Sequence, residues 1–372
     1  MTKFHWKQYF QQMMKNTDPV KIEQLAADAL RRILAQVPAI GRLNIRNAIK
    51  GGEREIDLIA DIEVFGQRHT LIAEVKSNGQ PRYVRSALLQ LQEYMRRRAE
   101  PATPVLIAPY LSVEAQDLCR EYETAYLDLE GNARLAFGTV FISRQVASRP
   151  QVERRELRSL FKPKSAQVLR QMLRDPGHSW RVAELAKAAG VSLGLVSNVR
   201  TGLLDREWAR LTNDGMLLSD PDRAAGRLER GVRTAYPTQR LGFYTTLHGA
   251  SFNEAVRRLP ATSLETGSTA LASFSAAQWL APYGRIGTHY FYADQQGLES
   301  LRSNLKLSPA SKGENVVVML LDDPGLFLDN TEPAPGVVCT SPVQTYLDLF
   351  KAGERGQEAA EHLRREQLKW TQ

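Results

Sequence analysis

Residues 52–64, Gly-Glu-Arg-Glu-Ile-Asp-Leu-Ile-Ala-Asp-Ile-Glu-Val, open the stretch that decides the fold of the first third of this chain. A short turn at residues 65–68 separates them from a second apolar run, Thr70 to Lys76. Two such runs joined by a turn predict a pair of adjacent β-strands. Successive side chains of a strand point to opposite faces, so Glu74 and Lys76 share one face of the second strand.

The polar residues of these two strands have the chemistry of a hard-cation site. Asp57 lies at the start of the first strand and Glu74 lies on the second. Mg²⁺ in proteins takes oxygen ligands, usually one or two carboxylates together with phosphate oxygens. A lysine beside such an ion, here Lys76, can orient a water molecule or stabilise charge on phosphorus.

These residues carry a resemblance to a nuclease superfamily. Asp57, a gap of 16 residues and Glu74-x-Lys76 resemble the PD-(D/E)xK nucleases. Gln90-x-x-x-Tyr94, on a helix expected after the second strand, resembles an additional motif of the RecB-like and Holliday-resolvase-like branches. The resemblance spans roughly residues 15–145 and implies an α/β nuclease-like domain.

The resemblance also implies roles for individual residues. Asp57 and Glu74 would hold the metal, Mg²⁺ or Mn²⁺ if the site is active, and Glu23 on an amphipathic helix is the third expected ligand. Lys76 would assist the attacking water, and Gln90 and Tyr94 would position the phosphate. The alternatives are a nuclease fold that has lost catalysis and a charged solvent face on an ordinary α/β domain, neither of which needs a metal.

Length and composition describe an ordinary globular protein of two or three domains. The chain has 372 residues, of which 43% are hydrophobic and 24% charged. Its longest apolar runs are far below the ~18 residues of a membrane span, and residues 1–7 lack the apolar core of a signal peptide. Cys119 and Cys339 are isolated, which indicates neither a disulfide framework nor a zinc site. We therefore expect a protein of the reducing cytoplasm.

The net charge of +8 is concentrated in one stretch. Residues 144–210 contain 14 Lys and Arg against 6 Asp and Glu, so the rest of the chain sums to zero. A local basic excess is typical of a surface that binds a polyanion. The alternative is a solvated linker helix.

Changes in pattern divide the chain into four parts. Residues 1–145 alternate helices with strands, residues 146–164 form a basic linker or exposed helix, residues 165–228 form a small helical unit, and residues 229–372 alternate again. The sequence thus predicts a multi-domain α/β protein. The expected helices are 20–34, 84–98, 113–123, 276–280, 343–351 and 357–369, and the expected strands are 56–64, 70–76, 105–108, 125–129, 140–143, 269–273, 288–293 and 316–321.

Residues 180–201 have the spacing of a DNA-binding helix-turn-helix. A small residue, a glycine four positions later and an apolar residue six positions after that correspond to Ala186, Gly190 and Val196. Glycine suits the turn because it accepts the left-handed conformation. Residues 203–218 are expected to add a third helix and a hairpin around Asn213-Asp214-Gly215. The unit is then similar to a winged helix, with a protein-interaction module as the alternative.

The second helix of this unit would enter the major groove of DNA. Asn198 is the best candidate to read a base, because an amide can pair with adenine through two hydrogen bonds. The expected base readers are Ser192, Leu193, Ser197, Asn198 and Thr201. The linker arginines and three other basic residues would hold phosphates and so position the protein. These three are Arg181, Lys187 and Arg200.

Three further strings resemble the AbiEi-type transcriptional regulators, the antitoxins of type IV toxin–antitoxin systems. They are residues 126–133, residues 275–277 with 282–283, and residues 338–349 continuing to 359–363. The resemblance implies autorepression through the winged helix and neutralisation of a nucleotidyltransferase-like toxin, without a stable complex between the two proteins. Asp128 and Asp348 lie among apolar neighbours within these strings, so we expect them to be structural.

The sequence therefore favours a sequence-specific DNA-binding regulator of the antitoxin type, whose partners are double-stranded DNA and a cognate toxin. Winged-helix regulators commonly dimerise, so a homodimer is also expected. The alternative function is a Mg²⁺-dependent DNA endonuclease that the winged helix targets to its site.

Overall fold

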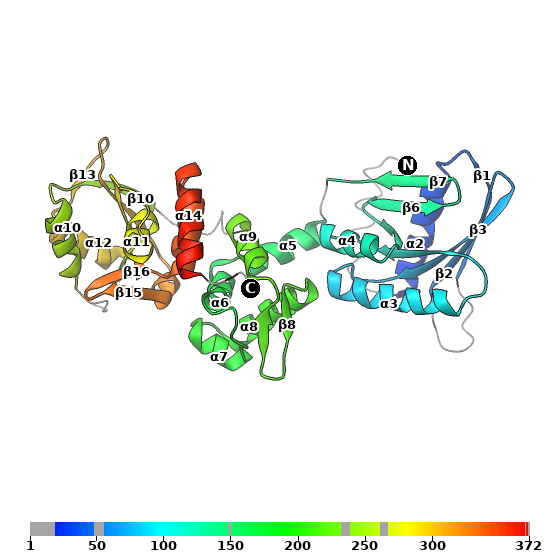
Figure 1. Ribbon diagram of the computed structural model, residues 1–372, viewed down its shortest axis with the longest axis horizontal. Helices are drawn as coiled ribbons and strands as arrows, with labels where there is room; N and C mark the ends of the chain where they lie inside the picture. Colours follow the sequence, from blue (N-terminus) through cyan, green and yellow to red (C-terminus); the bar gives the residue numbers. More distant parts are fainter. Residues whose placement is uncertain are drawn as a thin grey trace. The chain divides into compact units, whose positions relative to one another are not determined.

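The computed structural model describes residues 19–47, 56–147, 150–231, 239–260, 267–368 and 370. The chain divides into two compact units, the first ending at Arg154 and including 205–207, and the second comprising 155–204 and 208–372 (Figure 1). The multi-domain α/β class is confirmed. Three stretches discussed above, residues 1–7, 52–55 and 232–237, lie outside the described residues.

The first unit contains a seven-stranded mixed sheet. Its strands lie in the order β1 to β7, with parallel pairing from β3 to β5 and antiparallel pairing elsewhere. The elements are α2 (Pro19–Leu34), β1 (Ile40–Asn47), β2 (Leu58–Val64), β3 (Gln67–Val75), α3 (Pro81–Arg97), β4 (Thr103–Ala108), α4 (Val113–Glu121), β5 (Ala125–Asp128), β6 (Ala133–Phe137) and β7 (Val140–Arg144).

Helices cover both faces of this sheet. The alternation of side chains along β4 shows the division, because Val105 and Ile107 join the core beneath α2 whereas Leu106 and Ala108 join the core beneath α3 and α4. The result is three layers, helix, sheet and helix, around two apolar cores. The helices and strands expected between residues 20 and 143 are confirmed within a few residues, while β1 and β6 were not predicted.

The second unit begins with a helical region. Helix α5 (Gln151–Leu160) contains the residue at which the two units divide. Most of its side chains are exposed, so the predicted basic linker is largely an exposed helix. The elements that follow are α6 (Pro163–Arg174), α7 (Val182–Ala188), α8 (Leu193–Asp205), β8 (Ala209–Leu211), β9 (Met216–Leu218) and α9 (Pro221–Gly231). Within the described ranges no single helix has the length and apolarity to cross a membrane, and α7 with α8 meets that test only as a pair bent by 113°.

Helices α7 and α8 form the predicted helix-turn-helix. The angle of 113° falls in the range of ~90–120° typical of this motif. Gly190 in the turn has φ +61°, the left-handed conformation that favours glycine. Ala186 and Val196 are buried as the spacing required.

One detail of this region was predicted wrongly. No separate helix lies between α8 and the β8–β9 hairpin, because Leu203 belongs to the last turns of α8 itself. The third helix of the bundle is instead α6, which precedes the motif. The hairpin loop spans residues 212–215 and is closed by the hydroxyl and amide of Thr212, and Trp180 pairs with Met216 as a short bridge on the other side of β9.

The rest of the second unit is a mixed sheet with helices. Its strand order is β13-β10-β14-β12-β11-β16-β15. The elements are β10 (Gln239–Tyr244), α10 (Gly249–Arg257), β11 (Thr269–Leu271), α11 (Ser273–Leu280), β12 (His289–Ala293), α12 (Gln295–Asn304), β13 (Ser308–Pro309), β14 (Val316–Leu320), η2 (Pro324–Asp329), β15 (Asn330–Ala334), β16 (Val337–Thr340), α13 (Pro342–Phe350) and α14 (Glu354–Gln367).

The helical region and this α/β region share one hydrophobic core. A single cluster of buried side chains runs from α6, α7, α8 and the hairpin into α11, α13 and α14. The indole N–H of Trp370, just after α14, donates to the carbonyl of Leu173 at 2.8 Å, and the ring lies edge-on to Tyr346 with centroids 5.0 Å apart. Leu173 O is one of the last carbonyls of α6, which the helix itself leaves without a partner.

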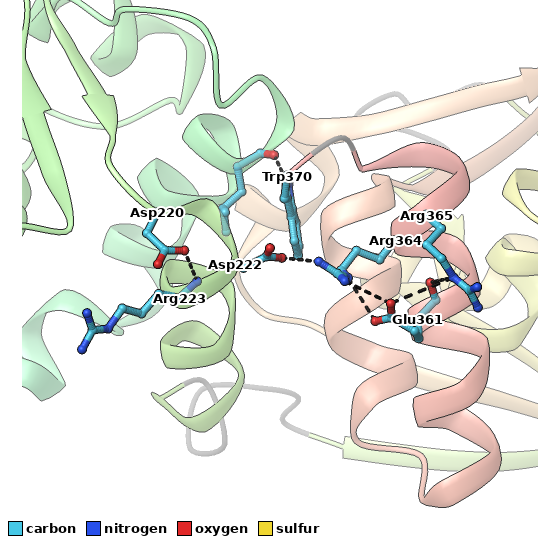
Figure 2. Close-up of polar contacts among 8 residues, drawn as sticks. Asp220, Asp222, Arg223, Glu361, Arg364, Arg365 and Trp370 are labelled. Carbon is cyan, nitrogen blue, oxygen red and sulfur yellow. Dashed lines mark hydrogen bonds and ion pairs between the residues drawn. The ribbon is translucent and has the colours of Figure 1, made fainter. Parts of the chain in front are cut away.

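Ion pairs reinforce the same junction. Figure 2 shows Arg364 of α14 between Glu361 on its own helix and Asp222 in the first turn of α9, at 3.0 Å and 2.5 Å. Asp220 caps that turn by accepting from the Arg223 amide. The segment around η2 makes a second set of contacts, in which Lys164 pairs with Asp323, Arg174 pairs with Asp329, and Leu328 lies against Gly190.

We expect the contacts of Trp370 with Leu173 and Tyr346 to stabilise α6 measurably. Trp370→Ala should lower the free energy of unfolding of the second unit by about 3–5 kcal/mol, because it removes a buried aromatic side chain. Trp370→Phe keeps most of the packing and should lower it by about 1 kcal/mol, the net value of one hydrogen bond. Urea unfolding combined with amide hydrogen exchange in α6 would measure both, and unchanged exchange in α6 of Trp370→Ala would contradict this stabilisation.

The two glycines that flank the start of α8 should respond in opposite directions. Gly190→Ala should lower the unfolding free energy by about 1–3 kcal/mol, because alanine resists the left-handed backbone and its Cβ would come within 2.5 Å of Leu328 Cδ1. Gly194→Ala, whose Cβ meets nothing within 4 Å in a helix, should raise it by about 0.5–1 kcal/mol. Urea unfolding would compare them, and equal effects would exclude the proposed strain at Gly190.

Candidate functional site

Helix α8 presents one buried and one exposed face. Val196, Val199 and Leu203 are buried in the shared core, which fixes the rotation of the helix about its axis. The opposite face consists of the predicted base readers together with one residue that was not predicted, Gly194. The exposed residues of this face are Ser192, Leu193, Gly194, Ser197, Asn198 and Thr201.

The exposed residues differ in whether their polar groups already form hydrogen bonds within the protein. Ser192 Oγ accepts from the Leu195 amide at 3.3 Å, so this side chain helps to begin the helix. Thr201 Oγ1 donates to the Ser197 carbonyl at 3.1 Å. The Asn198 amide has no hydrogen-bond partner among the residues that the structure describes, and Leu193 is 56% exposed. Among the polar residues predicted to contact bases, Asn198 is therefore the one most available to a ligand.

The basic residues predicted to hold phosphates lie on α7, on α8 and just before α7. Lys187 is exposed on α7, and Arg200 is half-buried on the flank of α8. Arg181 precedes α7 and is exposed, but its Nε donates to the Asp214 carbonyl at 3.3 Å. Arg181 thus ties the hairpin loop to the helical motif as well as carrying charge.

Two exposed side chains of the β8–β9 hairpin were missed from the sequence. Arg210 is exposed, and Leu211 is 51% exposed, whereas Ala209 beside them is buried. The alternation of buried and exposed positions was a usable signal, but a strand of only three residues gives it little weight. These two side chains extend the exposed surface beyond α8.

A second candidate site lies on the first unit, at the adjacent ends of β2 and β3. The Asp57 amide donates to Ala73 O, and its Oδ2 accepts from the Val75 amide at 2.8 Å, which places Asp57 beside Glu74. Lys76 Nζ pairs with Glu74 Oε1 at 2.5 Å and also donates to Gln90 Oε1 of α3 at 3.1 Å. The structure therefore brings four of the predicted residues together.

The fifth residue of that set, Tyr94, contributes differently. Its ring packs against Ile56, Ile72 and Leu91, in the small apolar cluster between β3 and α3. This position is one helical turn beyond Gln90, on the same side of the sheet. Tyr94 thus supports the surface on which Lys76 and Gln90 lie.

The prediction that Glu23 completes a metal shell is not supported by the structure. Glu23 is buried on α2, whose apolar side chains pack on the face of the sheet opposite to α3. In the described part of the chain no three His, Cys, Asp or Glu side chains are grouped so that they could hold a metal ion. The two carboxylates that remain, Asp57 and Glu74, match the number that Mg²⁺ commonly takes from a protein.

The acidic residues of the shared strings have structural roles. Asp128 accepts hydrogen bonds from the amides of Leu111, Gly131 and Asn132 and from the Asn132 side chain, while burial raises its pKa to about 6. Asp348 accepts from the Tyr292 hydroxyl and the Gln344 amide, and burial likewise raises its pKa to about 6. Both carboxylates hold loops and helices in place, as expected.

Comparison with known proteins finds a similarity for the C-terminal region. No curated protein matches the chain. Residues 233–369 match a family model described as transcriptional regulator, AbiEi antitoxin, type IV toxin–antitoxin system. The matched range covers the second sheet together with α13 and α14, the helices that complete the core of the α7–α8 region. This C-terminal region is therefore similar to the AbiEi antitoxins, a family of transcriptional regulators of type IV toxin–antitoxin systems.

Proposed function

We propose that this protein is a sequence-specific DNA-binding antitoxin that represses its own promoter through residues 163–218, acting as a winged helix. The observation that carries the proposal is the exposed face of α8, which the core orients outward and on which the Asn198 amide has no partner in the part of the chain that the structure describes. A helix of this kind fits the major groove, where side chains reach the base edges.

The charge around α8 supplies the second support. Residues 144–210 carry the whole excess of +8, and Lys187 of α7 and Arg210 of β8 are exposed. Basic side chains that contact phosphates release counterions, so they provide affinity that falls steeply with salt. They position the protein without selecting a sequence.

The family supplies the biological setting. AbiEi antitoxins belong to type IV systems, so a cognate toxin, of the nucleotidyltransferase-like kind implied by the resemblance, is the expected second partner. Such systems need no stable complex between antitoxin and toxin. Binding to a promoter places the protein in the cytoplasm, and a homodimer would match two half-sites of one operator.

The first test is binding to the DNA upstream of its own gene. Full-length protein should bind this duplex more tightly than random duplex at moderate salt. Asn198→Ala should weaken the specific complex by about tenfold or more, because a lost bidentate base contact is worth about 1–3 kcal/mol. Fluorescence anisotropy would measure both duplexes. Asn44→Ala is the matched control, since Asn44 is exposed on β1 of the first unit.

Salt dependence separates the phosphate contacts from the base contacts. Lys187→Ala should weaken specific and random DNA alike and reduce the slope of log K against log salt by about 1. Equal affinity of the wild type for its upstream DNA and random DNA would exclude the sequence-specific regulator.

The cluster of Asp57, Glu74, Lys76 and Gln90 favours a second candidate function, a metal-dependent nuclease. Asp57 and Glu74 would hold Mg²⁺ or Mn²⁺, and the ion would supply Lewis-acid stabilisation of the phosphoryl oxygens. The Lys76 ammonium, held between Glu74 and Gln90, is placed to orient the attacking water and to stabilise negative charge on phosphorus. Gln90 would contact the phosphate.

Cleavage assays test this second candidate directly. Labelled duplex, branched and single-stranded DNA would be incubated with Mg²⁺ or Mn²⁺, and with EDTA as the metal-free reference. If the site is active, Lys76→Ala and Glu74→Ala should each lower the rate by about 100-fold or more. Lys21→Ala, a change at an exposed lysine of α2, should have no effect. No cleavage by the wild type with either metal would refute the nuclease candidate and leave the regulator unaffected.

A further inference from the structure

The chemistry of the reading face of α8 indicates which base pairs it selects. At 3.6 residues per turn, Gly194, Ser197, Asn198 and Thr201 lie opposite the buried side chains Val196, Val199 and Leu203. Leu193 begins the same face. Arg200, a charged residue of the same helix, lies on its flank and is half-buried.

We propose that α8 reads A·T base pairs, through an adenine at Asn198 and thymine methyl groups at Leu193 and Thr201. The proposal rests on the DNA-binding function proposed above and names its target class. The Asn198 amide can donate to adenine N7 and accept from its N6 amino group. Leu193 offers an exposed apolar surface, which suits the C5-methyl group of thymine.

The polar group of Thr201 is already engaged. Its hydroxyl proton is donated to the Ser197 carbonyl within the helix, so this side chain offers the groove its methyl group and an acceptor oxygen, but no donor. Gly194 has open space around the position of a Cβ, so a base edge or backbone can approach the helix closely there. Both features favour contact with a thymine methyl over a hydrogen bond.

The residue types missing from this face favour A·T over G·C base pairs. Direct reading of guanine uses the paired donors of Arg or Lys, and reading of cytosine uses a carboxylate acceptor. The exposed set Leu193, Gly194, Ser197, Asn198 and Thr201 contains neither type. Arg181, which precedes α7, has its Nε bonded to the Asp214 carbonyl of the hairpin loop.

Selection from a randomised duplex library, followed by modified bases, tests the proposal. The full-length wild-type protein should enrich a site whose central positions are A·T. Replacing thymine by uracil in that site removes only the methyl group, and replacing adenine by 7-deazaadenine removes only N7. Each replacement should weaken wild-type binding by about 5- to 10-fold, the lower range for one base contact.

Matched variants assign each effect to a side chain. Leu193→Ala should remove the sensitivity to uracil at one position while keeping the sensitivity to 7-deazaadenine, and Asn198→Ala should do the reverse. Asn44→Ala should keep both sensitivities. All three positions are exposed, so the variants should fold normally.

The outcomes distinguish failure of the proposed A·T reading from failure of the proposed DNA-binding function. Enrichment of a G·C site, or an A·T site at which neither replacement matters, would overturn the A·T reading and leave the DNA-binding regulator standing. No enrichment of any sequence, even at low salt, would overturn both.

Discussion

The reading helix depends on a core that its own segment does not complete. Helices α6, α7 and α8 share one cluster of buried apolar side chains with α13 and α14, and the Trp370 indole donates to the carbonyl of Leu173 near the end of α6. A bundle of about 60 residues buries too little surface to be strongly stable alone. The family region, residues 233–369, therefore contributes to the shape of the surface that we propose binds DNA, although its own residues lie outside that surface.

The same packing decides what α8 can recognise. Gly190 allows the sharp turn, and Val196, Val199 and Leu203 then fix which residues face outward. Because burial sets the rotation of the helix, the chemistry of the exposed face follows from the periodicity of the apolar residues. A slip of one position would carry Asn198 toward the core, where its amide would need a new hydrogen-bond partner.

Local patterns predicted much of this, and long-range packing explains the rest. The helix-turn-helix spacing and the alternation in β2 and β3 were sufficient to find both candidate sites. Strand β1 was not predicted because only Leu43 and Ile45 give it an alternation of apolar and polar residues. Glu23 was assigned to the metal site because helical periodicity shows which side of a helix is buried, but not which face of the sheet that side covers. The shared core was also invisible, since it joins segments nearly 200 residues apart in the chain.

The exposed face of α8 and the basic stretch, residues 144–210, would contribute differently to DNA binding. The exposed face of α8 carries no formal charge, whereas residues 144–210 together carry the excess of +8. If α8 binds DNA as we propose, affinity would come mainly from phosphate contacts and would fall with salt, while discrimination between sequences would come from short-range contacts that salt barely screens. Raising the salt should weaken specific and random complexes by similar factors and leave their ratio nearly constant. A face that used arginine to read bases would couple the two quantities, because each reader would add to the potential that attracts any DNA.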